Sequence, residues 1–463
     1  MEGFMLSPVR QWAQQRPLQL ALRTPERDYT WAELSDVVSE TASTLAQQGV
    51  GQGDVLTCID KNNSELLFVL LACMELGTIC AISMPGSEQE RAQKLSTLYP
   101  ASNVVKLWSS RQDIRSTLRL DFSANERQRQ ENFSHSYHPD NLATLIFTSG
   151  STGPAKAVAH THAQHLASAT GLLAHFSFQP EDCWLLSLPL YHVSGMAIVY
   201  RWLVSGAQLK IGTGELAHDI QQVTHASLVA TQLKRLLDSP QPLQLSRVLL
   251  GGSHIPLELS QQAADRGIDT WLGYGLTEAA STVTAKRVDG KESAGVVLPH
   301  RRVMVHDGRI WIGGETLASG YYFQGQLTPL PTVSVPGHGD GFDSKDLGQW
   351  QNNELCILGR ADNLFISGGE NVHCEEIEAA LCTHSAIRQA IVVPIDDAEY
   401  GQRPIAVIDA NALPDKTELD SHLTTLLAKF KWPIAYYLMP HELTQTGIKV
   451  SRYEVKKFLV ASS

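Results

Sequence analysis

Cysteine is scarce and unpatterned in this sequence. The 463 residues include seven cysteines, at positions 58, 73, 80, 183, 356, 374 and 382, and no two of them form a C-x-x-C pair. An odd number without short spacings argues against a disulfide framework and against a zinc site. We therefore expect free thiols in the core of a protein that works in the reducing cytoplasm.

Long hydrophobic runs are absent as well. The longest, Leu66–Met74, has nine residues between Glu65 and Glu75, whereas a helix that crosses a bilayer needs about 20. The opening residues Met1–Met5 have no basic region followed by an apolar stretch, so no signal peptide is expected. We expect a soluble protein without membrane insertion.

The sequence also lacks an excess of positive charge. It has 37 Lys and Arg against 48 Asp and Glu, a net charge of −11. This balance argues against nucleic acid or an anionic membrane as the main partner. An anionic ligand must then be bound by local cations or backbone N–H groups.

Strand-like and helix-like segments alternate along most of the chain. Helical patterns cover residues 31–46 and a segment capped by Asn63 that ends before Gly77. Strand-like runs lie at 78–83, 143–147, 184–186, 227–230, 247–250 and 270–272. This alternation predicts a layered α/β fold with much parallel sheet.

A domain boundary is expected at Gly359-Arg360-Ala361-Asp362, where a strand-like run is followed by the glycine pair 368–369. We predict a large N-terminal domain over residues 1–360 and a small α+β domain over 361–463. The small domain would contain a helix at 375–382 and strands at 390–394 and 405–408.

The most informative motif is a loop rich in glycine and hydroxyl side chains that directly follows the strand at 143–147. It reads Thr148-Ser149-Gly150-Ser151-Thr152-Gly153-Pro154-Ala155-Lys156. Backbone N–H groups, hydroxyls and a lysine are the donors that bind phosphate oxygens. A Walker loop would need Gly at 155 and Ser or Thr at 157, where Ala155 and Ala157 stand. A turn with no ligand is the remaining alternative.

Taken with four later motifs, this loop resembles the adenylate-forming superfamily of acyl-CoA ligases, peptide synthetase adenylation domains and firefly luciferase. The later motifs are Gly251-Gly252-Ser253, Tyr274-Gly275-Leu276-Thr277-Glu278, Gly359-Arg360-Ala361-Asp362 and Gly447-Ile448-Lys449. Asp346 stands where the family has the Asp of a T-G-D triplet, although the preceding residues here are Ser344 and Lys345. All of these motifs occur in the family's order and spacing.

The resemblance implies a role for each position. ATP would be bound by Thr148, Ser149, Gly150, Ser151, Thr152 and Gly153 of the loop, and by Tyr274, Gly275, Asp346 and Arg360. Tyr274 would stack on adenine, while Asp346 and Arg360 would hold the ribose. Glu278 would bind Mg²⁺, and Lys156, Thr277 and Lys449 would be catalytic. Asp362 would be the hinge of the small domain.

The implied chemistry is activation of a carboxylate. Transfer to the α-phosphate of ATP gives an acyl-adenylate and diphosphate, and coenzyme A then displaces AMP to form a thioester. Lys449 lies in the small domain, so it can act only when that domain closes on the large one. The resemblance implies a rotation about Asp362 between the two steps.

The acid is indicated by Arg201, a lone charge in the apolar helical run 196–203. A buried arginine needs an anionic partner or several acceptors, and the alternative is that it extends to the surface. Residues 187–207, 224–229 and 447–452 resemble the family members that act on o-succinylbenzoate, an aromatic dicarboxylate of menaquinone biosynthesis. The resemblance implies that Arg201 serves the non-reacting carboxylate, and that Tyr191, His192, Gly251, Gly252 and Ser253 enclose the ring.

Two other functions are open at this stage: a CoA ligase for another acid, and an inactive adenylate-binding protein. The joint presence of Lys156, Thr277, Glu278, Asp362 and Lys449 argues against inactivity. The spacing of His160, His162 and His165 does not place three metal ligands on one helix face, which favours packing roles. The sequence does not decide between a monomer and a homo-oligomer.

Positive charge is concentrated at the C-terminal end despite the acidic total. Residues 429–463 carry six basic and two acidic side chains. Cations near the end of a solvated helix are one explanation. The other is that this segment meets the phosphates of ATP and CoA.

Overall fold

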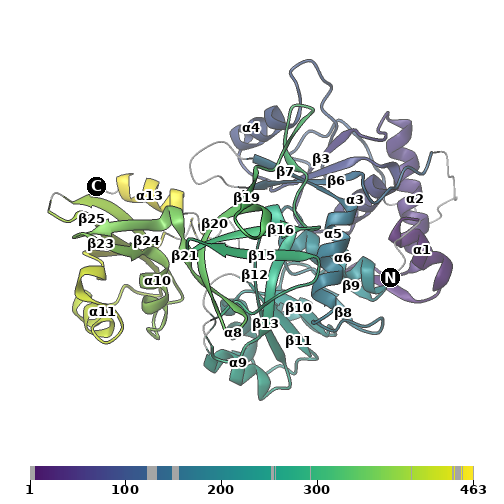
Figure 1. Ribbon diagram of the computed structural model, residues 1–463. Helices are drawn as coiled ribbons and strands as arrows, with labels where there is room; N and C mark the ends of the chain where they lie inside the picture. Colours follow the sequence, from purple (N-terminus) through teal and green to yellow (C-terminus); the bar gives the residue numbers. More distant parts are fainter. Residues whose placement is uncertain are drawn as a thin grey trace.

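The computed structural model describes residues 6–122, 133–148, 156–251, 255, 257–291, 293–397, 399–440, 443, 450 and 452–461. The strands of these residues form four sheets, three before Arg360 and one after it. Figure 1 shows the last sheet with its helices on the left and the larger body on the right.

The first sheet carries the predicted phosphate loop. Its order is β18-β17-β7-β6-β4-β3-β5. The strands β5, β3, β4 and β6 are parallel, and β7 and β17 extend the sheet in antiparallel fashion. Their bounds are β3 Val55–Ile59, β4 Ile79–Ser83, β5 Leu107–Trp108, β6 Leu142–Thr148, β7 Lys156–Thr161, β17 Gly320–Phe323 and β18 Gln326–Pro329.

The second sheet is larger, with the order β14-β13-β12-β11-β10-β8-β9-β1-β2. Its strands from β1 to β12 along this order are parallel. The bounds are β1 Leu20–Arg23, β2 Asp28–Thr30, β8 Cys183–Leu185, β9 Gln208–Lys210, β10 His225–Leu228, β11 Arg247–Leu250, β12 Asp269–Leu276, β13 Ser281–Arg287 and β14 Val296–Val297. The layered α/β fold with parallel sheet is thereby confirmed.

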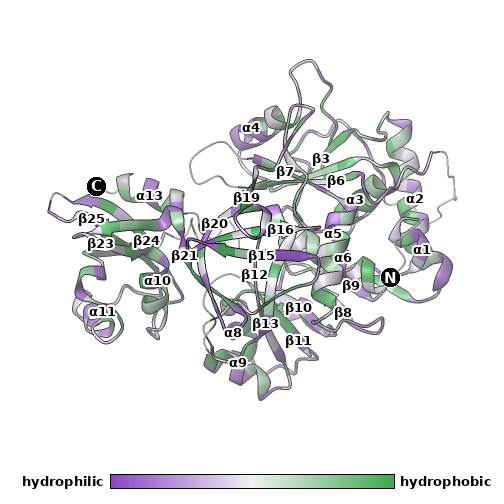
Figure 2. Ribbon diagram, in the orientation of Figure 1, coloured by the Kyte–Doolittle hydropathy of each residue, from purple (hydrophilic) through white to green (hydrophobic). Residues whose placement is uncertain are grey.

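Helices cover and separate these two sheets. α5 (His162–Leu173) contacts β7 of the first sheet and β13 of the second, and it packs against α6 (Val193–Ser205). The other helices of the large domain are α1 Pro8–Gln15, α2 Trp31–Gln47, α3 Ser64–Leu76, α4 Glu88–Leu98, α7 Leu216–Asp219, α8 Ala230–Asp238 and α9 Leu257–Ala264. Figure 2 shows α6 in mainly hydrophobic colours and α4 in mainly hydrophilic ones.

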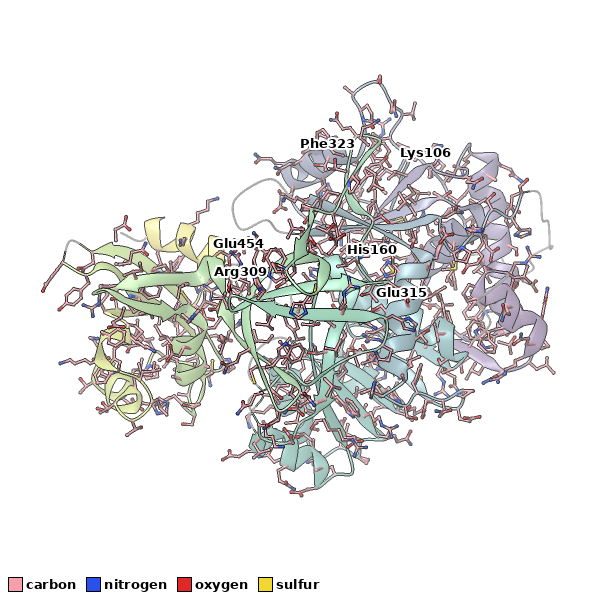
Figure 3. All side chains as sticks on the ribbon, viewed as in Figure 1. Lys106, His160, Arg309, Glu315, Phe323 and Glu454 are labelled. Atoms are coloured by element: carbon pink, nitrogen blue, oxygen red, sulfur yellow. The ribbon has the colours of Figure 1, made fainter. Side chains whose placement is uncertain are left out.

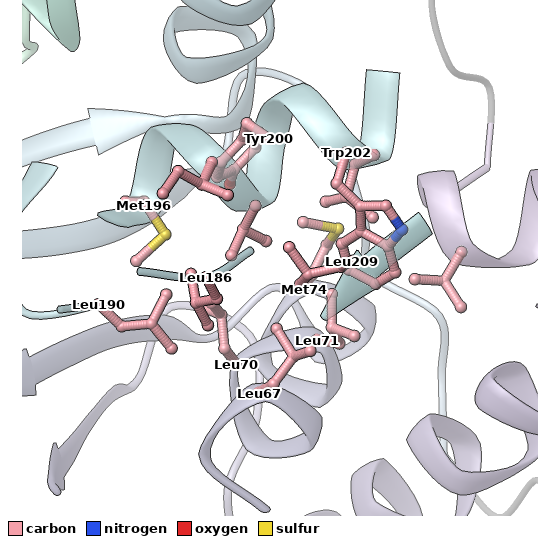
Figure 4. Close-up of a cluster of buried hydrophobic side chains, with 14 of the residues drawn as sticks. Leu67, Leu70, Leu71, Met74, Leu186, Leu190, Met196, Tyr200, Trp202 and Leu209 are labelled. Atoms are coloured by element: carbon pink, nitrogen blue, oxygen red, sulfur yellow. The ribbon is translucent and has the colours of Figure 1, made fainter. Parts of the chain in front are cut away.

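The apolar run at 66–74 forms a core helix. Asn63 caps α3 by accepting from the backbone N–H of Leu66 at 2.7 Å, and Gly77 ends it with a φ of +65°. Figure 4 shows Leu67, Leu70, Leu71 and Met74 of this helix packed with Met196, Tyr200 and Trp202 of α6. In the part of the chain that the structure describes, no helix is long and apolar enough to cross a membrane.

A third sheet connects the large body to the small domain. It has the order β15-β16-β20-β19, with β21 paired to β20. Its bounds are β15 Arg301–His306, β16 Arg309–Gly314, β19 Thr332–Val335, β20 Gly339–Gln351 and β21 Glu354–Arg360.

The chain after Arg360 builds a fourth sheet with cores of its own. The strands β22 Leu364–Ser367, β23 Glu370–His373, β24 Gln389–Asp397, β25 Gly401–Asp409 and β26 Ala435–Leu438 are covered by α10 Cys374–Cys382, α11 Lys416–Leu423 and α13 Arg452–Ala461. Short 3-10 helices are η1 Thr277–Ala279, η2 Ala361–Asn363 and η3 Lys429–Lys431. A large N-terminal and a small C-terminal domain are confirmed, while the boundary at 360/361 stays a prediction.

Several predicted strands differ from the observed ones in their bounds; for example, β25 covers Gly401–Asp409 where the sequence predicts 405–408. The run at 227–230 was expected as a strand, but β10 covers His225–Leu228 and α8 already begins at Ala230. The observed strand begins with His225, a buried polar residue that an apolar pattern does not include. The strand predicted at 270–272 is longer, because β12 continues to Leu276 and includes Tyr274 and Gly275.

Candidate active site

The ends of β6 and β7 bring Thr148 and Lys156 together. The two residues are opposite each other in the antiparallel register of the two strands. The loop residues Ser149, Gly150, Ser151, Thr152 and Gly153 lie outside the described residues, so their predicted contacts with ATP stay predictions. Lys156 itself is exposed at the end of the sheet.

Tyr321 of β17 connects Lys156 to Glu278. The Lys156 ammonium lies 4.8 Å from the centre of the Tyr321 ring, and the Tyr321 hydroxyl donates to Oε1 of Glu278 at 3.2 Å. Burial, followed by the charge of Glu278, raises the pKa of Tyr321. The sequence did not indicate Tyr321, because its place depends on the pairing of β17 with β7.

Glu278 fits the predicted metal role. A carboxylate is the hard oxygen ligand that Mg²⁺ prefers, usually together with phosphate oxygens. Tyr321 occupies one oxygen of Glu278. The carboxylate therefore retains an oxygen that can bind a cation.

Tyr274, Asp346 and Arg360 form a second connected group. The Tyr274 hydroxyl donates to Oδ2 of Asp346 at 2.5 Å, and Nη1 of Arg360 donates to Oδ1 at 3.2 Å. Asp346 and Arg360 are direct neighbours in the register of β20 and β21, and Asp346 is only 7% exposed. Ser344 supplies a hydroxyl that accepts from the Asp346 backbone N–H at 3.1 Å. The predicted adenine and ribose residues therefore lie together despite the missing Thr-Gly.

Arg360 also reaches the predicted hinge residue. Its Nε donates to Oδ1 of Asp362 at 2.8 Å and its Nη2 to Oδ2 at 3.1 Å. Burial alone would raise the pKa of Asp362, but these hydrogen bonds and the Arg360 charge hold it below its ordinary value. One guanidinium thus connects the third sheet to the start of the small domain.

The segment that holds Thr277 approaches its neighbours closely. A Cβ on Gly275 would lie 1.8 Å from the carbonyl oxygen of Ser281, so only glycine fits at this position. His160 donates from Nε2 to the Thr277 carbonyl at 2.9 Å, with the neutral ring tautomer assigned from this contact. His160 is labelled in Figure 3 inside the large domain.

Arg201 is buried inside α6 and is 2% exposed. Its Nη2 donates to Oγ1 of Thr282 at 3.1 Å, and its charge lies 5.4 Å from the centre of the Trp184 ring. Its Nε has no hydrogen-bond partner within the part of the chain that the structure describes. Among the described residues no carboxylate forms an ion pair with it. Burial, followed by the charge of Arg301, lowers the pKa of Arg201 well below its ordinary value. The alternative that Arg201 extends to the surface is therefore wrong.

The remaining residues predicted for the acid lie at the start of the same helix and at the end of β11. The rings of Tyr191 and His192 are 4.8 Å apart, and His192 is the N-cap residue of α6. Burial, followed by the charge of Lys94, lowers the pKa of His192. Gly251 directly follows β11, whereas Gly252 and Ser253 lie outside the described residues, as does the catalytic candidate Lys449.

The three clustered histidines have separate partners. His160 bonds the Thr277 carbonyl, His162 bonds the Tyr200 hydroxyl at 2.8 Å, and His165 bonds the Thr144 hydroxyl at 2.8 Å. Burial lowers the pKa of His160 to about 4 and that of His162 to about 3. The rings are therefore neutral packing groups, in agreement with the prediction.

Comparison with known proteins places this geometry among nucleotide-binding enzymes. Residues 9–322 match the AMP-binding enzyme family, and residues 376–448 match the AMP-binding enzyme C-terminal domain. The 2-succinylbenzoate–CoA ligase of Salmonella typhimurium is 38% identical over 98% of this chain and 97% of its own length. That of Haemophilus influenzae is 39% identical over 95% of both.

Solved structures agree with these relatives. An arginine-to-lysine variant of Escherichia coli MenE with bound OSB-AMS has a TM-score of 0.85 at 36% identity, covering 99% of each chain. The o-succinylbenzoate CoA synthetase (MenE) of Bacillus subtilis, in complex with the acyl-adenylate OSB-AMP, has a TM-score of 0.82 at 25% identity, covering 98% of each chain. The same enzyme with ATP and magnesium has a TM-score of 0.78 at 26% identity, covering 94% of this chain and 95% of the other.

Proposed function

Because this chain belongs to the AMP-binding enzyme family, we infer that it is an ATP-dependent acid–thiol ligase of menaquinone biosynthesis. It converts o-succinylbenzoate and coenzyme A to o-succinylbenzoyl-CoA, with ATP giving AMP and diphosphate through an acyl-adenylate. Relatives with this activity match it over nearly their whole length. The substrate expected from the sequence around Arg201 is the same.

One observation in the structure carries the choice of acid. Arg201 is buried, has an Nε without a partner and forms no ion pair with any carboxylate of the described chain. A buried guanidinium is costly unless an anion compensates its charge. A dicarboxylate supplies that anion with the carboxylate that does not react. A fatty acid or benzoate has a single carboxylate, which is the reacting group.

The same geometry supports roles for the other residues. We assign Tyr274, Asp346 and Arg360 to the adenosine part of ATP, and Lys156 and Thr277 to its phosphates. Mg²⁺, held by Glu278 when bound, supplies charge neutralisation at the phosphates. The protein's own contribution is to position a carboxylate against a polyanion and to offset the repulsion between them.

We also propose a cytoplasmic location. The support is that the seven cysteines are all free and six of them are buried, which suits a reducing compartment.

Turnover of a panel of acids tests the proposed function. Diphosphate release should require ATP and o-succinylbenzoate, and CoA thioester should form only when CoA is added. Benzoate and fatty acids should react at least tenfold less efficiently. Efficient turnover of another acid would instead assign a different CoA ligase, and no release with any acid would indicate an adenylate-binding protein without activity.

A further inference from the structure

The turn between η1 and β13 has a strained backbone. Ala280 and Ser281 are consecutive non-glycine residues with φ values of +50° and +90°. Side chains disfavour this region, and such strain persists only where surrounding contacts hold it. The turn is separated from Glu278 by Ala279 alone and directly precedes Thr282, so it joins the two halves of the proposed site.

Ser168 of α5 holds this turn from one side. Its hydroxyl donates to the carbonyl oxygen of Ala280, and both residues are buried. On the other side, the backbone N–H of Ala280 donates to the Thr277 carbonyl at 3.1 Å. The strained conformation therefore depends on a contact with a helix far away in the sequence.

Arg301, the first residue of β15, fixes Ser168 in turn. Its Nη2 donates to the Ser168 hydroxyl at 2.8 Å and to the Ser168 carbonyl at 2.9 Å, and its Nη1 donates to the Pro299 carbonyl at 2.8 Å. A Cβ on Gly171 would lie 2.0 Å from Nη1, so this glycine leaves room for the guanidinium. No group of the proposed reaction uses Arg301.

Arg301 connects α5 to β15 through a buried charge, and burying a charge costs desolvation free energy. Arg301 is 8% exposed, and within the described ranges no carboxylate forms an ion pair with it. Burial lowers its pKa. Apolar residues of similar volume often stabilise a fold as well or better, so a role in stability alone does not account for it.

The far end of the turn leads to Arg201. Thr282 lies immediately after Ser281, and its hydroxyl accepts from Nη2 of Arg201. The contacts therefore run from Arg301 through Ser168 to the strained turn. Thr277 and Glu278, which we assign to ATP and Mg²⁺, precede the turn in the sequence, and Thr282, which bonds Arg201, follows it.

We propose that Arg301 and Ser168 are positioning residues that hold the strained turn at Ala280 and Ser281, and thereby fix the spacing between Thr277 and Glu278 on one side and Arg201 on the other. This inference rests on the proposed function. Neither residue touches a reacting group. Their effect is to align the bound carboxylate with the α-phosphate, where small displacements are costly.

Ser168→Ala is the sharpest test, because it removes the hydroxyl and leaves the bonds of Arg301 to backbone carbonyls. We expect kcat/KM for o-succinylbenzoate to fall at least tenfold, through both a lower kcat and a higher KM for the acid. The KM for CoA should stay within about twofold. Preference over an analogue with hydrogen in place of the non-reacting carboxylate should fall at least fivefold.

Arg301→Lys is the second variant, since lysine keeps the charge but lacks the fork that spans Ser168 and Pro299. It should show the same kinetic pattern. Arg302→Met is the matched control, because Arg302 is the exposed neighbour on β15 and donates to the Asp340 carbonyl. Its kinetic constants should stay within twofold of the unaltered protein.

A double-mutant cycle separates positioning from stability. If the turn acts through Arg201, Ser168→Ala should have little further effect in a protein that already carries Arg201→Ala. There it should lower the preference for o-succinylbenzoate over the analogue by at most threefold. Lower melting temperatures with unchanged kinetic constants in both variants would overturn the proposal. Failure of the proposed function is distinguishable, because the unaltered protein would then not turn over o-succinylbenzoate at all.

Discussion

At the residue scale, Arg201 is a buried cation that pairs with no carboxylate of the described ranges, and a buried cation of this kind destabilises the free protein. Its Nη2 bond to Thr282 holds the guanidinium in place but does not compensate its charge. We propose that an anionic substrate group restores the free energy that folding loses here. On this proposal, one residue both weakens the free fold and selects the acid.

Arg201→Ala should therefore change acid binding much more than nucleotide binding. A hydrogen bond to a charged group contributes about 1.5–3 kcal/mol, so we expect KM for o-succinylbenzoate to rise roughly 10–100-fold, with KM for ATP within about threefold. Steady-state kinetics with each substrate varied measures both. An unchanged KM for o-succinylbenzoate would remove Arg201 from acid binding.

The buried histidines make stability depend on pH. Burial lowers the pKa of His160 to about 4 and that of His162 to about 3, from 6.5. The unfolded chain therefore binds protons that the folded state excludes, and stability falls as pH drops from about 6.5 towards 3. The loss from His160 alone is roughly 3 kcal/mol once the pH is below 4.

Unfolding by urea between pH 8 and pH 4 measures this effect. His162→Gln should flatten the pH dependence, whatever it does to stability at pH 8. The matched control His175→Gln, at an exposed position, should leave the slope unchanged. An equal slope in all three proteins would contradict the assignment of the buried rings as neutral.

At the element scale, β17 completes the site. Its antiparallel pairing with β7 places the Tyr321 ring under Lys156 and the Tyr321 hydroxyl against Glu278. The strand at residues 320–323 thus brings together two groups that lie far apart in the sequence. Lys156 belongs to the same sheet, and Glu278 follows a strand of the second sheet.

Tyr321→Phe should weaken the response to magnesium while preserving the ring beneath Lys156. Groups that orient a metal-binding carboxylate typically affect metal affinity by 10–100-fold, and we expect about a tenfold rise in the Mg²⁺ concentration for half-maximal diphosphate release. Tyr322→Phe, the next residue of β17, is the control. Equal responses of both variants to Mg²⁺ would exclude an orienting role for Tyr321.

The sequence predicted those elements that capping residues delimit or that a continuous apolar run marks. Asn63 and Gly77 delimit α3, and the apolar run at 247–250 is β11 without change. It did not indicate the third sheet, because a strand such as β19 exposes most of its residues and shows little apolar alternation. Tyr321, Thr282 and Ser168 were missed for a related reason: each acts through a contact between segments distant in sequence, which local patterns do not record.

At the scale of the whole molecule, the junction of the two domains is built from charged side chains. Arg360 bonds Asp346 of β20 and Asp362 of η2. In the small domain, Nε of Arg452 donates to the Val392 carbonyl at 2.9 Å, and its Nη2 bonds Glu378. The beginning of α13 is therefore fastened to β24. We propose that Asp362 is the hinge and that the basic C-terminal segment moves with the small domain as one unit.

Lys449→Ala tests this two-conformation hypothesis, because Lys449 belongs to the small domain while the other proposed catalytic residues belong to the large one. If Lys449 serves only adenylation, diphosphate release should fall about 10²–10³-fold, the usual cost of one lost charge-stabilising donor. Thioester formation from supplied acyl-adenylate and CoA should stay within about twofold.

Lys457→Ala, at an exposed position of α13, is the control, because it removes an equal charge from the same domain and should spare both steps. Equal loss of both half-reactions in Lys449→Ala would mean that one arrangement of the domains serves the whole reaction. Loss in both lysine variants would attribute the effect to the general charge of the segment, because then no single side chain would be the donor.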